Sequence, residues 1–172
     1  MRIEIGSAKR DDTDWISEAL LAFLDEMSIL AADIAPAPDA DQRIQADVGS
    51  WVADPHRLLN LARFEGSPVG LIHAQTWRLP PVYAGKEEIF VAEIYVLPEY
   101  RSNGIGKSLV NSALEWGRQR GAEGLRASVM TANDSSIAFW TALGAKSVVA
   151  DYSIDIDADP RRSVRKRARL GF

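Results

Sequence analysis

One short segment constrains this chain more than any other. Residues 101–107 read Arg-Ser-Asn-Gly-Ile-Gly-Lys and lie between a predicted strand and a predicted helix. A helix N-terminus offers unpaired N–H groups and a partial positive charge, and glycines let such a backbone approach an anion closely. Arg101 and Lys107 add positive charge. The segment therefore predicts a site for a phosphate-bearing ligand at the start of this helix.

Two nucleotide-binding motifs match this segment only in part. A dinucleotide fingerprint fails because Leu109 takes the place of its third glycine. In addition, Arg126 stands about 20 residues beyond Gly106, where that motif requires an acidic residue. A P-loop fails because its first glycine would fall at Arg101. A helix start that contains glycine but binds nothing is the remaining alternative.

Composition indicates one globular domain. The chain has 172 residues, 47% apolar and 26% charged, so residues 1–172 are expected to form a single domain with its own core. It has no cysteine and two histidines, and we therefore expect no metal site. Its apolar stretches are too short to cross a bilayer, and none near the N-terminus is typical of a signal peptide. These features predict a cytoplasmic protein with no membrane partner.

Charge is unevenly distributed along the chain. The net charge is −4, although six arginines and lysines lie at residues 161–169, so the rest of the chain is more acidic than the total. An acidic body repels nucleic acid, and no nucleic-acid partner is expected. Residues 163–170 alternate between apolar and basic, which favours a half-buried strand over the alternative, a nucleic-acid-binding tail.

Hydrophobic periodicity gives the order of the elements. The first half predicts a strand at 2–5, helices at 12–27 and 40–52, and strands at 58–64, 69–76 and 88–96. The second half predicts a helix at 104–120, a strand at 125–130, a helix at 133–143, and strands at 146–156 and 163–170. Short connections make the strands at 58–96 antiparallel neighbours, whereas the strand–helix–strand order through 88–130 requires a parallel pair. The expected fold is α/β (α+β), with a mixed, mostly antiparallel sheet of about seven strands and helices on both faces.

Two longer motifs give a family resemblance. Residues 92–106 read Ala-Glu-Ile-Tyr-Val-Leu-Pro-Glu-Tyr-Arg-Ser-Asn-Gly-Ile-Gly. They closely resemble the acetyl-CoA signature of the GNAT superfamily of N-acetyltransferases, a strand and a proline-containing turn followed by Arg/Gln-x-x-Gly-x-Gly/Ala. Residues 133–144, with Asn133, Ala138-Phe139-Trp140 and Leu143-Gly144, resemble the family's later motif. The order of elements also agrees along nearly the whole chain.

The resemblance implies how a cosubstrate would bind. In the GNAT fold two central parallel strands splay apart and acetyl-CoA inserts between them. Its pyrophosphate would lie on the loop that opens the helix, and its pantetheine arm would pair with the preceding strand. Asn133 would contact this arm, although it also fits a helix N-cap. The residues expected to bind the cosubstrate are Ile94, Tyr95, Val96, Arg101, Ser102, Asn103, Gly104, Ile105, Gly106, Lys107 and Asn133.

The implied reaction transfers an acetyl group to a primary amine of a small molecule or a protein. An alkyl ammonium group has a pKa of roughly 10, so it must lose a proton before it attacks the thioester directly. Glu93, between apolar neighbours, is the candidate general base, and a solvated glutamate at a strand edge is the alternative reading. Many relatives carry a glutamate on the next strand, but Ser128 stands at that position here.

The sequence offers more than one candidate for the proton donor. The family often has a tyrosine, thought to protonate the CoA thiolate, where this chain has Trp140. An indole N–H is no practical acid at neutral pH, so we expect Trp140 to pack in the core. Tyr95 is the candidate acid, and Tyr152 and solvent are the alternatives.

The acceptor is defined only by its charge. Aspartates in the first helices, together with Trp51, Trp77 and Tyr83, suit a cationic small molecule, although an ordinary acidic surface would look the same. A non-catalytic acyl-CoA-binding sensor on the same fold is the second hypothesis for function. The sequence leaves the oligomeric state open, a homodimer included.

Overall fold

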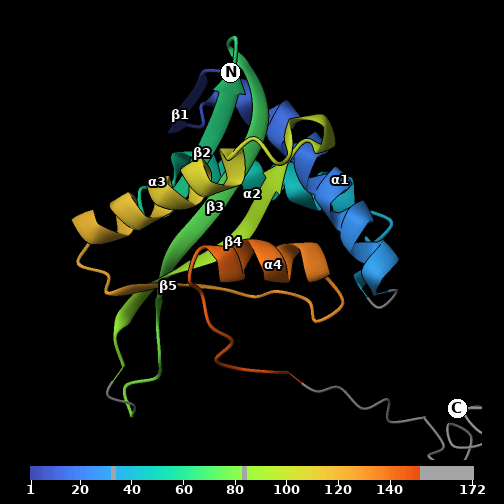
Figure 1. The fold of residues 1–172 in the computed structure, drawn as a ribbon. Helices are drawn as coiled ribbons and strands as arrows, with labels where there is room; N and C mark the ends of the chain where they lie inside the picture. Colours follow the sequence, from blue (N-terminus) through green and yellow to red (C-terminus); the bar gives the residue numbers. More distant parts are fainter. Residues whose placement is uncertain (32–33, 83–84, 152–172) are drawn as a thin grey trace, which may run out of the picture. The chain divides into compact units, whose positions relative to one another are not determined.

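The computed structural model of the protein describes residues 1–31, 34–82 and 85–151 (Figure 1). The chain divides into two compact units, Met1–Phe139 and Trp140–Phe172. The first unit contains the whole described sheet, and the second is described as far as residue 151. The organisation of residues 1–172 as a single domain stays a prediction.

Helices and strands follow the predicted order, with ends that differ by a few residues. The strands are β1 (Ile3–Ser7), β2 (Arg57–Phe64), β3 (Ser67–Arg78), β4 (Glu87–Val96) and β5 (Gly124–Ala127). The α-helices are α1 (Thr13–Leu30), α2 (Ala40–Ala53), α3 (Ile105–Gln119) and α4 (Asp134–Ala142). Two short 3-10 helices, η1 (Arg10–Asp12) and η3 (Pro98–Tyr100), precede α1 and follow β4.

The described strands form one mixed sheet. They lie in the order β1-β2-β3-β4-β5, with antiparallel pairing up to β4 and a parallel β4–β5 pair. Helix α3 connects the parallel strands, as a crossover between parallel neighbours requires. The predicted mixed sheet with one parallel pair is thus confirmed.

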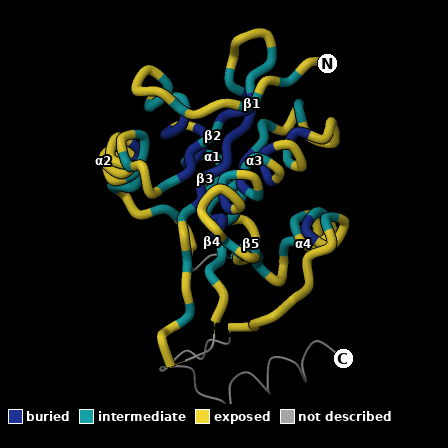
Figure 2. The backbone as a smooth tube through the Cα atoms, turned by 90° about the vertical axis from the view of Figure 1, so that its left-hand side faces the viewer, coloured by how far each residue is buried: buried dark blue, intermediate teal, exposed yellow. Residues whose placement is uncertain are grey.

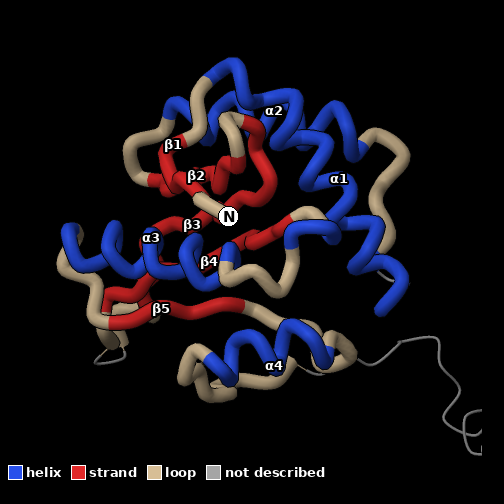
Figure 3. Tube along the Cα trace, turned by 45° about the horizontal axis from the view of Figure 1, so that its top comes forward, coloured by secondary structure: helices blue, strands red, loops and turns tan. Residues whose placement is uncertain are grey.

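Helices cover both faces of this sheet (Figure 3). Leu59 and Leu61 of β2 point to one face, where they join the core of α1 and α2. Asn60, between them, points to the other face, and its Nδ2 donates to Ser112 Oγ of α3 at 3.1 Å. Because side chains alternate along a strand, β2 packs against helices on both sides. Buried residues accordingly gather along the central strands (Figure 2).

A β-bulge changes the direction of the side chains along β4. Opposite β3, Glu93 pairs with His73 but Val91 pairs with Ala74, so Ala92 is an extra residue. Ile89, before the bulge, lies against Gly117 of α3. In a regular strand residues 89 and 93 would share a face, whereas the bulge turns Glu93 to the side of α1 and α2.

The expectation of about seven strands is wrong for the described residues, which contain five. The strand predicted at 146–156 is absent over its described part, residues 146–151, where Val148 and Val149 are exposed. Alternating apolar residues form a strand only where the backbone pairs with a neighbour, and the described sheet ends at β5. The rest of that strand and the one predicted at 163–170 lie outside the described residues.

Candidate active site

The parallel strands pair over a short length. Residues 88–91 of β4 pair with 124–127 of β5, and β4 continues to Val96 without a β5 partner. The strand predicted at 125–130 therefore ends at Ala127, because Ser128 and the residues after it have no ladder to join. The stretch of β4 that leaves β5 contains Glu93 and the three residues predicted to pair with a pantetheine arm.

The loop after β4 leads directly into the N-terminus of α3. Gly104 caps this helix with a φ of +77°, a conformation that suits glycine, and no side chain caps the helix. The first bond along the helix runs from Ser108 N–H to the Gly104 carbonyl at 3.1 Å. The N–H groups of residues 105–107 precede that bond and carry the positive end of the helix dipole. This geometry suits an anion such as a pyrophosphate.

Close packing explains the second glycine of the loop. A Cβ at Gly106 would lie 3.1 Å from the ring of Phe139 in α4. Such a contact is too short for the ring to accept without moving. Phe139 and Gly106, one from each motif quoted above, thus pack against each other at the start of α3.

Arg101, predicted to face phosphate, has an internal carboxylate partner. One guanidinium nitrogen lies 2.7 and 2.9 Å from the two Glu26 carboxylate oxygens, and its Nε donates to the Val96 carbonyl at 2.9 Å. The Tyr95 hydroxyl donates to the same carboxylate at 3.2 Å. We call Glu26, Tyr95 and Arg101 the α1–loop cluster. Glu26 was missed from the sequence, because nothing in α1 indicates which of its charged residues meets the loop.

Tyr95 is held among apolar groups. Its side chain is buried and makes an edge-on contact with the Phe23 ring, with 6.4 Å between ring centroids. Burial, and after it the nearby Glu26 carboxylate, raise the pKa of Tyr95 above the usual tyrosine value. The hydroxyl therefore stays protonated at neutral pH and is a weaker acid than an exposed tyrosine.

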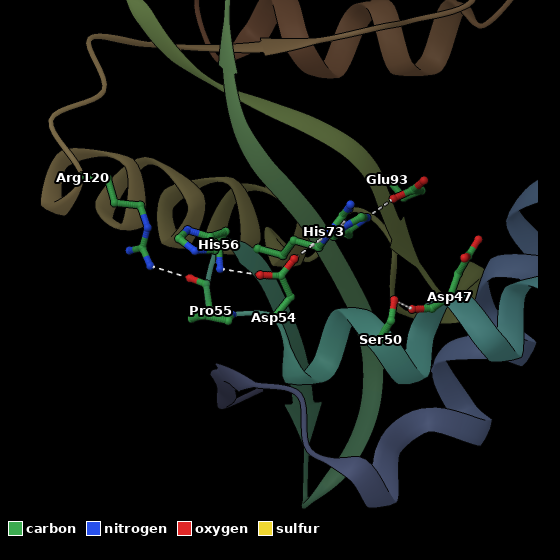
Figure 4. Close-up of polar contacts among 9 residues, drawn as sticks. Asp47, Ser50, Asp54, Pro55, His56, His73, Glu93 and Arg120 are labelled. Atoms are coloured by element: carbon green, nitrogen blue, oxygen red, sulfur yellow. Dashed lines mark hydrogen bonds and ion pairs between the residues drawn. The ribbon is translucent and has the colours of Figure 1, made fainter.

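Glu93 meets a buried histidine from the neighbouring strand. His73 Nδ1 lies 2.6 Å from Glu93 Oε2 (Figure 4). The Glu93 side chain is 24% exposed, whereas that of His73 is 2% exposed. The bulge at Ala92 makes this contact, because it turns Glu93 to the face on which His73 lies. Glu93 is thus neither a solvated edge residue nor a fully buried one.

Further residues surround the His73 ring. The Trp51 indole of α2 stacks on it, with 4.1 Å between centroids and 16° between planes. Arg57 NH1 lies 3.1 Å from His73 Nε2, and Arg57 Nε lies 3.3 Å from Asp54 Oδ2. We call Glu93, His73, Arg57 and Trp51 the histidine network. A signal for it exists in the sequence: His73 interrupts an apolar run in a central strand, where a polar side chain needs a partner.

The remaining predicted residues lie at the start of α4, in the loop before α3, in α3 itself and on β4. Asn133 Oδ1 accepts from the Ser136 N–H at 2.9 Å, which confirms the N-cap, and its Nδ2 lies 3.8 Å from Met27 Sδ. Asn103 donates to loop carbonyls, and Lys107 is exposed. Their roles toward a cosubstrate stay predictions. Ile94 and Val96 lie on the free stretch of β4, and Ser102 lies in the loop, with a φ of +62°.

Two aromatic residues of the predicted acceptor region lie on different elements, Trp51 on α2 and Trp77 on β3. Trp51 stacks on His73, whereas Trp77 lies beneath the Arg126 guanidinium at 4.7 Å. Tyr83 lies outside the described residues, and so does Tyr152. Trp140 is buried, as predicted.

Within residues 1–31, 34–82 and 85–151, the structure has neither a candidate metal site nor a membrane-spanning helix. No group of three or more histidine, cysteine, aspartate or glutamate side chains there could hold a metal ion. None of its helices has the length and apolar character needed to span a membrane.

Comparison with known proteins decides the family. Residues 23–145 match the acetyltransferase (GNAT) family. The chain belongs to the GNAT family. The match covers both motifs, the free stretch of β4 and all of α3. It also includes His73 and Glu93.

Curated relatives match over shorter segments. A thialysine N-epsilon-acetyltransferase of Bos taurus is 35% identical over 60 residues, which are 35% of this GNAT chain and 35% of that protein. An uncharacterised N-acetyltransferase of Methanocaldococcus jannaschii is 32% identical over 79 residues, 46% of this chain and 34% of that protein. The chain thus spans about a third of the length of these relatives.

A solved structure shares the fold over most of the chain. An aminoglycoside N-acetyltransferase in complex with CoA superimposes with a TM-score of 0.71 at 17% identity. The superposition covers 91% of this chain and 96% of that one. At this identity the likeness shows the fold alone, and it agrees with the mixed sheet and crossover described above.

Proposed function

We propose that this GNAT protein is an acyltransferase that moves an acetyl group from acetyl-CoA to a primary amine, with Glu93 as general base. One observation carries the proposal. Strand β4 leaves β5 after Val91, presents Glu93, and then runs directly into the loop that opens α3. A candidate base and a candidate phosphate site therefore lie at the two ends of one short segment.

The proposed cosubstrate site uses both backbone and charge. The free N–H groups at residues 105–107 would bind the pyrophosphate, with Lys107 adding positive charge. The stretch from Ile94 to Val96 would pair with the pantetheine arm. The aminoglycoside N-acetyltransferase, which shares the fold, was solved with CoA bound, and this supports the assignment. Acetyl-CoA supplies the activated acetyl group.

The proposed chemistry removes two protons from the acceptor nitrogen and exchanges a C–S bond for a C–N bond. Glu93 takes a proton from the ammonium group, directly or through water. The neutral amine then forms a C–N bond with the acetyl carbon, the nitrogen loses its second proton to solvent, the C–S bond breaks, and CoA leaves as a thiolate. Backbone dipoles at residues 94–96 would polarise the thioester carbonyl. Tyr95 is the proposed proton donor to the thiolate, with solvent as the alternative, since the raised pKa of Tyr95 weakens it as an acid.

The acceptor is proposed from chemistry that two matched proteins share. One is named for thialysine and the other for aminoglycosides, both of which carry primary amines. We propose a cationic small-molecule amine for this chain, and a protein amine is the alternative. Cytoplasmic location and assembly as a homodimer stay predictions.

Calorimetry and a turnover assay test the function in sequence. CoA and acetyl-CoA should bind to the full chain, whereas ATP with Mg²⁺ and NAD should not, since the loop lacks the residues that those motifs need. A panel of polyamines, aminoglycosides, amino acids and peptides then tests acetyl transfer. Binding of ATP without CoA would overturn the assignment. Binding of CoA with no transfer to any amine would favour the acyl-CoA sensor.

A further inference from the structure

Both ring nitrogens of His73 have a partner in the histidine network. His73 needs one partner to satisfy each ring nitrogen, and it has both: Glu93 at 2.6 Å and Arg57 at 3.1 Å. Neither partner is its neighbour in sequence, since Glu93 comes from β4 and Arg57 from β2. Three adjacent strands thus converge on the carboxylate proposed to take the proton.

The donor properties of arginine fix the tautomer of His73. A guanidinium has only N–H donors and no acceptor. His73 Nε2, which faces Arg57 NH1, must therefore accept, and the proton of the neutral imidazole resides on Nδ1. That Nδ1–H points at Glu93 Oε2 and donates to it. A hydrogen bond to a charged acceptor is stronger than one between neutral groups.

Packing fixes the plane of the ring. Trp51 stacks against it almost in parallel, and the ring is 2% exposed. Arg57 is in turn held by Asp54. The carboxylate is therefore anchored through Oε2 to a buried ring that is held by contacts at both nitrogens and on one face. The Glu93 side chain itself is 24% exposed, which leaves a route by which a substrate reaches it. Fixed geometry of this kind matters, because a displacement of about 1 Å can cost about 100-fold in rate.

The same geometry excludes a proton relay toward the interior. Nδ1 already carries a proton, and Nε2 faces a donor, so neutral His73 cannot accept a proton from Glu93 without losing Arg57. A proton taken by Glu93 must return through its exposed side.

From these contacts we propose that His73 is a positioning residue, which donates through Nδ1–H to Glu93 and holds the carboxylate in the orientation used for proton abstraction. The inference rests on the proposed function, because it assigns His73 a role only through Glu93. Arg57 and Trp51 act on Glu93 through His73, the first by fixing its tautomer and the second by fixing its plane.

Nitrogen NMR of the full chain tests the geometry without any substrate. The chain has only two histidines, so His56→Gln assigns the ¹⁵N ring signals of His73. We expect a protonated Nδ1 and an unprotonated Nε2 at pH 7–8. Arg57→Met should move the population toward a mixture of the two tautomers. A wild-type His73 with its proton on Nε2 would overturn the proposal.

A double-mutant cycle tests the positioning role. His73→Phe keeps a ring on Trp51 but has no N–H, and His73→Asn places an amide N–H close to the position of Nδ1. We expect His73→Phe to lower kcat by about 10- to 100-fold, the range for a hydrogen bond to a charged group. The KM for acetyl-CoA should stay unchanged, and His73→Asn should recover part of the loss. In a Glu93→Gln background His73→Phe should cost little more, because both changes remove one function.

The outcomes separate this inference from the function on which it rests. Equal loss from His73→Phe with and without Glu93 would make His73 structural and overturn the proposal. Should His73→Phe fail to fold, Arg57→Met carries the same cycle, with a smaller expected loss. A wild-type protein that binds no CoA and acetylates no amine would overturn the proposed function and with it the positioning role, whereas the NMR result would still stand for the contact.

Discussion

Two polar clusters join β4 to its surroundings, and they differ in exposure. The histidine network is centred on a ring that is 2% exposed, whereas the Arg101 and Glu26 side chains of the α1–loop cluster are 43% and 42% exposed. In both clusters a carboxylate lies at hydrogen-bond distance from a side-chain nitrogen, that of His73 in the first and that of Arg101 in the second. The His73–Glu93 contact is therefore mostly shielded from solvent, whereas the Arg101–Glu26 contact is accessible to it.

Exposure to solvent determines how easily each of the two contacts can be replaced. Exposed ion pairs contribute about 0–1 kcal/mol, because water and salt screen them. A phosphate group arriving at the loop could therefore take the place of the Glu26 carboxylate at Arg101 at small cost. A buried hydrogen-bonded group has no such substitute, and removing one partner leaves the other unsatisfied. We expect changes in the histidine network to alter kcat, and changes at Glu26 and Arg101 of the α1–loop cluster to alter cosubstrate affinity.

Glu93→Gln should have the largest effect. It keeps the shape of the side chain but removes its basicity, so kcat should fall by about 10²- to 10⁴-fold. CoA affinity by calorimetry should change little, because the loop is untouched. Glu18→Gln, the same chemical change at an exposed position of α1, is the control. Near-normal turnover of Glu93→Gln at neutral pH would place the base elsewhere.

Trp51→Leu should have an intermediate effect. The change removes the stacked ring but neither hydrogen bond of His73. Aromatic pairs contribute about 0.5–1.5 kcal/mol beyond burial, so kcat should fall by about 2- to 10-fold. Steady-state kinetics with saturating acetyl-CoA measures this loss. A fall in acetyl-CoA affinity alone would show that Trp51 belongs to the cosubstrate site and does not act through His73.

Glu26→Gln should have a smaller effect of opposite sign. Removing this carboxylate frees Arg101 and takes a negative charge from beside the loop, so CoA should bind up to about 5-fold more tightly. Calorimetry at low and high salt tests this, because screening should reduce the gain. Glu18→Gln on the same helix is again the control. Weaker binding would mean that Glu26 is needed to hold the loop in place.

The pH dependence of stability should show the smallest effect. Because the folded state raises the pKa of Tyr95, its contribution to the free energy of unfolding is complete below the ordinary tyrosine pKa of about 10. That contribution should be lost as pH rises through the raised value. Urea unfolding between pH 8 and 11 should therefore show a shallower decline for Tyr95→Phe than for wild type. Identical slopes would contradict the assigned burial effect.

Local patterns predicted most of the fold. The helices at 12–27 and 104–120 have clear helical periodicity, and their observed bounds, Thr13–Leu30 and Ile105–Gln119, differ from these by a few residues. The antiparallel strands were predicted by short connections. The strand at 146–156 was wrong over its described part, because alternation reports which side chains could be buried and cannot report whether a neighbour supplies the ladder.

The candidate site, like the fold, was predicted only in part from the sequence. The loop and Glu93 lie in one continuous segment that the sequence displays directly. His73, Arg57 and Glu26 lie 20, 36 and 67 positions before Glu93 in the chain, and they reach β4 only through the pairing of β3, β2 and α1. The partnership of Glu93 with His73 further depends on a bulge of one residue, which no periodic pattern marks.

That bulge has a consequence for anyone who transplants this site to another scaffold. Glu93 and His73 are direct cross-strand partners, so two regular antiparallel strands would keep their contact. The segment of β4 that packs on α3 could be copied with them only if Ala92 were included. Without it, either Glu93 or Ile89 would emerge on the wrong side of the sheet. Inserting or deleting one residue between positions 89 and 93 would therefore turn either Ile89 or Glu93 to the opposite face of the sheet. A graft of the whole site would have to include the bulge together with the two side chains.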